Sequence, residues 1–158
     1  MSKKVVFAFE PEFVDALRQV FEVGIVFNQV LGLRLETITE TVATASLEMR
    51  SELVGHSAYN RLHGGVIAAS LDALGGVAVL AAVGARHGDK SIAERMQHYS
   101  KLGTIDLRVD FLRPAIGERF TLRAEVLRVG SRVGSTRSEF YAADGKLLST
   151  GSAAYMVS

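Results

Sequence analysis

The chain has 158 residues with a formal net charge of +1, and 48% of its residues are apolar and 22% charged. This is the composition of a single soluble globular domain, expected to span residues 1–158, and the near-neutral charge gives no basis for nucleic-acid binding. The absence of cysteine excludes disulfides, thiolate metal sites and a cysteine nucleophile.

The N-terminal segment combines a short apolar run with a predicted helix. Two lysines precede the run Val5–Phe9, which is shorter than the roughly 7–15 apolar residues of a signal peptide, so we expect a cytoplasmic protein without a leader. A helix is predicted over residues 12–27, because apolar residues recur there at helical spacing after a proline favoured in a first turn: Pro11, Phe13, Leu17, Val20 and Phe21.

Two strands and a loop are predicted next, followed by the most apolar segment of the chain. Residues 33–39 and 42–49 are expected as strands and residues 51–62 as a loop. A second helix is predicted from Gly64 or Gly65 to Val83. The stretch Val66–Val83 within it is close to a bilayer span in length, but Asp72 near the centre of the stretch would cost about 2.5–3.5 kcal/mol in a membrane. We therefore expect a buried core helix and no membrane partner.

The second half of the chain predicts a connector and four strands. In the connector, residues 84–103, Ser91 and Glu94 have the spacing of a capping box, which predicts a short helix. The strands are expected over residues 104–114, 120–129, 133–143 and 147–157, as an antiparallel meander. The first has Ile105 and Leu107 on one face and Thr104 on the other, and the third and fourth flank the hairpin signal Asp144-Gly145. The second strand loses its alternation at Val126-Leu127, which suggests a bulge.

An almost wholly apolar helix needs cover on all sides. A curved antiparallel sheet covers much of it, and a second copy of the chain is the simplest cover for the rest. The predicted architecture is α+β, with a sheet wrapped around the central helix and a homo-oligomer as the expected state.

Asp72 is the most informative residue, because aspartate is unfavourable inside helices and is rarely buried without a partner. Its neighbours three and four positions away are all very small: Ala68, Ala69, Gly75 and Gly76. Such a face leaves room for a ligand or another helix. Two interpretations stay open, a general base beside a substrate and a structural aspartate bonded to a donor elsewhere in the fold.

The helix begins with His63-Gly64-Gly65, and its N-terminus presents free N–H groups that a carbonyl oxygen can approach, as in an oxyanion hole. The alternative is that these glycines only shape the turn into the helix. Gly64 and Asp72 would be about 12 Å apart along one helix, which is too far for one reacting carbonyl. We therefore predict a site shared across a subunit interface.

These motifs together resemble the hotdog-fold acyl-CoA thioesterases, in the phenylacetate-pathway (PaaI-like) branch. The resemblance covers about residues 12–157 and is carried by Leu62–Gly65, by Leu71-Asp72, by the strand that ends in Pro114-Ala115, and by the order of the elements. It implies dimers, often paired into tetramers, that hydrolyse an acyl-CoA thioester.

The resemblance also implies roles for individual residues. Asp72 would be the catalytic base or nucleophile, the N–H of Gly64 would polarise the thioester carbonyl, and Thr104 would help to place the water. His63 would orient the loop or bond near the carbonyl. Many relatives have Asn or Gln six residues before this histidine; this position is Ser57 here, and Asn60 is the other candidate for that contact.

Other candidate groups concern the CoA moiety and metals. The expected substrate-binding residues are Ser57, Gly65 and the three arginines around the turn at Gly130-Ser131, which either bind the CoA phosphates or form a polar hairpin end: Arg128, Arg132 and Arg137. The four histidines do not have zinc-site spacing, so no metal or other cofactor is expected. The alternatives to a thioesterase are a non-catalytic acyl-CoA-binding hotdog module and an acyl-thioester dehydratase or hydratase, whose histidine motifs we do not find.

Overall fold

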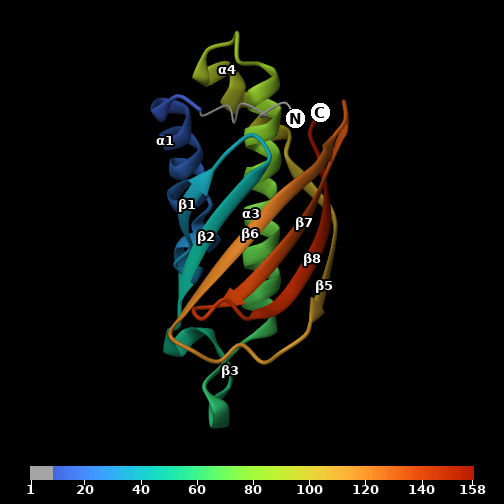
Figure 1. The fold of residues 1–158 in the computed structure, drawn as a ribbon. Coiled ribbons are helices and arrows are strands. Elements are labelled where there is room, and N and C mark those ends of the chain that lie inside the picture. The colour runs from blue at the N-terminus through green and yellow to red at the C-terminus, as the bar shows by residue number, and fades with distance from the viewer. Residues whose placement is uncertain (1–8) are drawn as a thin grey trace, which may run out of the picture.

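A computed structural model describes residues 9–158, which form a six-stranded antiparallel sheet curved around one long helix (Figure 1). The helix is α3, Gly64–Arg86, and the sheet order is β1-β2-β6-β7-β8-β5. The strands are β1 Arg34–Ile38, β2 Val42–Glu48, β5 Gly103–Phe111, β6 Arg119–Val129, β7 Val133–Ala142 and β8 Leu147–Met156. This is the expected sheet around a central helix. The run considered as a leader lies, up to residue 8, outside the described residues.

The predicted four-strand meander is wrong for its first strand. β6, β7 and β8 follow one another as neighbours, but β5 pairs with β8 at the far edge, and β6 pairs with β2. The chain between β5 and β6 therefore passes the segment just before α3. There the N–H of Leu62 donates to the carbonyl of Ala115 (2.9 Å), and Arg61 forms an isolated antiparallel β-bridge with Ile116. Placing β5 on the far edge lets the sheet reach further around the apolar helix.

The predicted alternation of β5 is also wrong at its first residues. The pairing register with β8 slips between Thr104 and Asp106. As a result Thr104, not Ile105, lies on the helix-facing side with Leu107, and the side chain of Ile105 is exposed. The predicted bulge in β6 is confirmed between Val126 and Arg128, and Gly145 has the positive φ (84°) that the predicted hairpin turn requires.

The predicted N-terminal helix is interrupted. It divides into α1 Pro11–Gln19, a π-helical turn η1 Val20–Gly24, and α2 Val26–Leu31, because Ile25 is extended (φ −87°, ψ 95°). The π turn leaves the carbonyl of Phe21 without its usual helical donor, and the buried Asn28 side chain donates to it instead (2.8 Å). A buried asparagine stabilises the break, and apolar spacing alone does not reveal it.

The remaining segments are short. The predicted loop contains a small hairpin, β3 Val54–His56 and β4 Arg61–Leu62, with 3₁₀ turns η2 Ser51–Leu53 and η3 Ser57–Tyr59. The predicted capping box is confirmed at the start of α4 Ile92–Met96, which continues into a 3₁₀ segment, η4 Gln97–Lys101.

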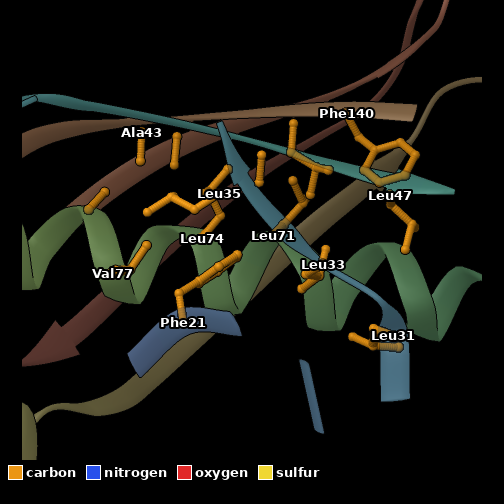
Figure 2. Packing of buried hydrophobic residues seen from close by; sticks show 14 of the residues in the cluster. Phe21, Leu31, Leu33, Leu35, Ala43, Leu47, Leu71, Leu74, Val77 and Phe140 are labelled. Carbon is orange, nitrogen blue, oxygen red and sulfur yellow. The ribbon is translucent and has the colours of Figure 1, made fainter. Parts of the chain in front are cut away.

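Apolar side chains cover α3 from two sides. Figure 2 shows Leu71 and Leu74 of α3 among sheet residues such as Ala43, with Phe21 of the N-terminal segment on the opposite side. Within residues 9–158, α3 is long and apolar enough to cross a membrane, but 67% of its most apolar window is buried inside the protein. The prediction of a core helix is confirmed.

Candidate active site

Asp72 lies on α3 with a partly exposed side chain, and its nearest partner comes from the sheet. The hydroxyl of Thr104 on β5 donates to a carboxylate oxygen of Asp72 (2.9 Å). The bulge after Thr104 makes this bond possible, since it turns that side chain toward the helix. The structure therefore brings together two of the residues that the sequence singled out.

A mainly apolar cavity of about 330 Å³ adjoins this pair. Its polar lining includes Asp72, Thr104 and Tyr155. Its apolar walls come from α3, the interrupted N-terminal helix and Leu102, which lies just before β5: Val20, Ile25, Phe27, Ala69, Ala73, Gly76, Val77, Leu80 and Leu102. The volume lies at the lower end of the range for small-molecule sites. Small residues on this face of α3 do leave space for a ligand, as the spacing predicts, and the break at Ile25 helps to shape the opposite wall.

Tyr155 on β8 is a contact of Asp72 that the sequence analysis missed. Its hydroxyl donates to the backbone carbonyl of Asp72 (2.9 Å), and the residue is only 1% exposed. Burial, and then the charge of Asp72, raise the pKa of the Tyr155 phenol far above its ordinary value, so the hydroxyl remains a donor. A Cβ atom on Gly75 would overlap this hydroxyl. Gly75 therefore makes room for Tyr155 and not for a ligand.

The start of α3 has the geometry of a capped helix N-terminus. His63 is the N-cap residue, and its Nδ1 accepts a hydrogen bond from the N–H of Gly65 (2.8 Å). The Gly65 N–H is thus already bonded, whereas the Gly64 N–H has no acceptor within residues 9–158. Of the two glycines, Gly64 has the N–H available for a carbonyl oxygen.

Gly64 and Asp72 do not line the same cavity in one chain. Gly64 lies in a second hollow, of about 420 Å³, together with Phe111, Leu112, Arg61 and Arg113. Since α3 is continuous between Gly64 and Asp72, about 12 Å of helix separates them. One chain therefore presents the two halves of the expected machinery at separate places.

The two candidates for the additional polar contact lie in the hairpin before α3. Ser57 belongs to η3 and Asn60 follows it in the left-handed conformation (φ 46°), which asparagine tolerates better than most residues. Both are exposed, and neither side chain hydrogen-bonds to another group in the described part of the chain. Their roles in substrate contact stay predictions.

The three arginines predicted to bind CoA phosphates lie on β6, on β7 and in the turn between these strands. Arg137 projects from β7 beside Glu125 (3.9 Å), and Arg128 lines a hollow with Arg86, at the C-terminal end of α3. Arg132 lies in the adjacent turn, where its carbonyl accepts from the N–H of Val157. The two ends of α3 are about 33 Å apart, so Arg128 lies far from Gly64 in the same chain. Arg61 and Arg113, which the sequence analysis did not consider, line the hollow of Gly64.

Within residues 9–158 no group of three or more histidine, aspartate or glutamate side chains is arranged to hold a metal ion.

Comparisons with known proteins identify the family. The model of the thioesterase superfamily matches residues 59–149. The chain belongs to the thioesterase superfamily. The medium/long-chain acyl-CoA thioesterase YigI of Escherichia coli K12 is 40% identical over 131 residues, which are 83% of this chain and 84% of YigI. The expected class of enzyme, a thioester hydrolase, is confirmed.

Solved structures of the superfamily have the same fold. A Shewanella oneidensis protein related to the thioesterase superfamily superposes with a TM-score of 0.86 and 35% identity, over 95% of this chain and 100% of that one. A thioesterase family protein from Silicibacter pomeroyi has a TM-score of 0.72 and 25% identity, over 91% and 96% of the two chains. The expected hotdog fold is confirmed, while the phenylacetate-pathway branch stays a prediction.

Proposed function

We propose that this thioesterase hydrolyses acyl-CoA, with Asp72 as the catalytic carboxylate. The observation that carries the proposal is the Asp72–Thr104 pair at the edge of an apolar cavity. The substrate class is supported by YigI, whose name specifies medium- and long-chain acyl-CoA. An apolar cavity beside the carboxylate suits the acyl chain of such a substrate, since its walls replace water around the methylene groups.

The chemistry needs two functions, activation of a nucleophile and stabilisation of the oxyanion. Acting as a base, Asp72 takes a proton from a water molecule that Thr104 helps to place, and the water oxygen attacks the thioester carbonyl. The Gly64 N–H donates to the developing oxyanion. The intermediate then loses the CoA thiolate, which takes up a proton, and the free acid remains. Direct attack by the Asp72 carboxylate, followed by hydrolysis of the anhydride, is the other route open to the same residue.

We propose that the site combines Asp72 of one subunit with Gly64 of another. The separation of these residues along α3 supports this arrangement. So does β5, which pairs with β8 on one side and has no strand on its other side within residues 9–158. Its exposed apolar residues, Ile105 and Phe111, with the adjacent Leu112, suit a cytoplasmic homodimer or a tetramer of two dimers. Ser57, Asn60 and Gly65 would then lie near the partner's cavity, and Arg128, Arg132 and Arg137 remain candidates for the CoA phosphates.

The test is thiol release from short, long and aromatic acyl-CoA esters. Wild type should turn over at least one ester, and Asp72→Asn should lower kcat by about 10²–10⁴, as expected when a positioned base is lost. Asp89→Asn, an exposed aspartate near the other end of α3, is the matched control and should keep full activity. Full activity of Asp72→Asn would refute the assignment. Binding of acyl-CoA by wild type without turnover would instead indicate a non-catalytic binding module.

A mixing experiment tests the shared site. Gly64 is the first residue of α3, where proline is tolerated, so Gly64→Pro removes the N–H with little strain on the helix backbone. Asp72→Asn and Gly64→Pro should each be nearly inactive. When the two are unfolded and refolded together, a mixed dimer with a shared site contains one intact pair, and activity should return. A mixture that stays inactive, although mass spectrometry detects mixed dimers, would place the whole site within one chain.

A further inference from the structure

We propose that Tyr155 is a positioning residue for catalysis, which holds the backbone of the helical turn that carries Asp72 while Thr104 holds its carboxylate. This inference rests on the proposed role of Asp72. It assigns a function to the buried hydroxyl of Tyr155, which donates to the main-chain carbonyl of Asp72.

The first support is the register of the sheet. Thr104 on β5 and Tyr155 on β8 are direct partners across the two strands. Both reach the same residue of α3, Thr104 through the carboxylate oxygen and Tyr155 through the main-chain carbonyl, each at 2.9 Å. A single cross-strand pair therefore fixes Asp72 at two points, one on its side chain and one on its backbone.

The second support is that the helix is shaped to admit the tyrosine. A Cβ atom at Gly75 would overlap the hydroxyl of Tyr155, and one at Gly76 would lie 3.6 Å from its ring. The ring thus lies against bare helix backbone, one turn after Asp72. Glycine is less favourable than alanine inside a helix, and at Gly75 the approach of Tyr155 accounts for that loss of stability.

The third support is the environment of the hydroxyl. Tyr155 is almost completely buried and stays neutral, so its hydrogen bond does not compete with water. The Asp72 carbonyl has a second lone pair beyond the one used in the helix, and the phenol binds it laterally from the sheet. This tether resists rotation or sliding of α3 past β5 and β8, and such motion would move the carboxylate relative to the thioester.

The consequence concerns turnover more than substrate affinity. A displacement of about 1 Å at a reacting group can reduce the rate up to about 100-fold without removing any contact to substrate. Tyr155→Phe deletes the hydroxyl and keeps the ring. It should lower kcat about 5–50-fold and leave KM within about twofold, since the walls of the apolar cavity remain. Tyr141→Phe, a tyrosine of β7 away from Asp72, is the matched control and should match wild type.

A double-mutant cycle separates positioning from a general loss of structure. Thr104→Val removes the other point of attachment, so its effect in the Tyr155→Phe background should differ from its effect in wild type by at least about threefold. All variants are measured at a temperature where circular dichroism shows them fully folded. Wild-type kcat for Tyr155→Phe would overturn the inference, as would additive effects or a loss that appears in KM alone.

The two proposals fail in different ways. If Asp72→Asn remains active, the proposed function fails, whatever Tyr155 does. If Asp72→Asn is inactive and Tyr155→Phe has wild-type kcat, Asp72 keeps its role and Tyr155 is a structural residue only.

Discussion

The two halves of α3 have nearly the same composition and very different surroundings. Every residue from Leu74 to Gly84 is buried. Of the ten residues from Gly64 to Ala73, five are partly buried and one is exposed. We call these the closed half (residues 74–84) and the open half (residues 64–73). The candidate catalytic groups, Gly64 and Asp72, both lie in the open half.

The difference comes from what packs against each half. The ring of Phe13 in α1 covers the closed half so tightly that a Cβ on Gly84 would overlap it, and the guanidinium of Arg95 stacks over that ring (3.5 Å to its centroid). Arg95 also pairs with Glu10. The N-terminal helix breaks at Ile25, opposite the cavity beside Asp72, which residues of both halves line. A further hollow, lined by Gly65, Val66 and Ala69, lies against the open half alone. One end of the helix thus stabilises the fold, and the other end is available for chemistry.

The largest expected effect on stability comes from removing the cover of the closed half. Phe13→Ala should lower the free energy of unfolding by about 3–5 kcal/mol, because it creates a cavity and removes the Arg95 stacking. Urea denaturation measures the loss, and Val26→Ala, an exposed residue of α2, is the control. At a temperature where Phe13→Ala is folded, kcat should stay near the wild-type value. A strong fall in kcat under those conditions would contradict the separation of the two halves.

A smaller effect is expected from adding one methyl group to the closed half. Gly84→Ala should destabilise the protein by about 1–3 kcal/mol through overlap with Phe13, which exceeds the gain of about 1 kcal/mol from better helix propensity. Gly88→Ala, beyond the end of α3, where an added Cβ would make only an ordinary contact with the Ala85 carbonyl (3.7 Å), should be neutral within about 0.5 kcal/mol. Unfolding midpoints of the two variants provide the comparison. Equal midpoints would show that the Phe13 ring shifts to accommodate the added methyl group without loss of stability.

The last effect is a pH dependence of the contact between Tyr155 and Asp72. Because the pKa of Tyr155 is raised in the folded protein, the unfolded chain loses this proton first as the pH rises. The contribution of Tyr155 to stability is therefore complete below pH about 10, the ordinary tyrosine value, and falls by about 1.4 kcal/mol per pH unit above it.

Unfolding measured between neutral and alkaline pH tests this sign. Tyr155→Phe should be less stable than wild type at neutral pH, and the difference should shrink above pH about 10. Tyr59→Phe, an exposed tyrosine, should follow wild type at every pH. A difference between Tyr155→Phe and wild type that grows with pH would contradict the assignment of a raised pKa.

Features with a local cause could be predicted from the sequence. The capping box of Ser91 and Glu94 and the hairpin at Asp144-Gly145 depend on residues within one turn of each other, and both are confirmed. The position of Asp72 in an apolar helix could also be recognised, since a carboxylate there needs an explanation from elsewhere in the fold. Thr104 was identified only through the resemblance to a family, because its own strand pattern places it on the wrong face.

Features that depend on contacts between residues far apart in the sequence were not predicted, or were predicted in the wrong place. The break at Ile25 is stabilised by the Asn28 side chain and faces a cavity. The apolar spacing of the helix continues across the break, so the spacing does not reveal it. Tyr155 lies 83 residues after Asp72, and nothing in its own strand indicates that its hydroxyl reaches a helix carbonyl. The glycine pair after Asp72 was a signal of close approach, but the spacing does not say whether a ligand or a side chain approaches.

The sequence by itself determined the order of the elements, the central apolar helix, the anomalous carboxylate and the family resemblance, because these follow from local periodicity and short motifs. The tertiary structure alone decided which strand lies at which edge, which face of β5 meets the helix, and which hydroxyls hold Asp72. Those outcomes depend on crossing connections, a one-residue slip in strand register and contacts between residues far apart in the chain. The periodicity and short motifs of the sequence do not reveal any of these features.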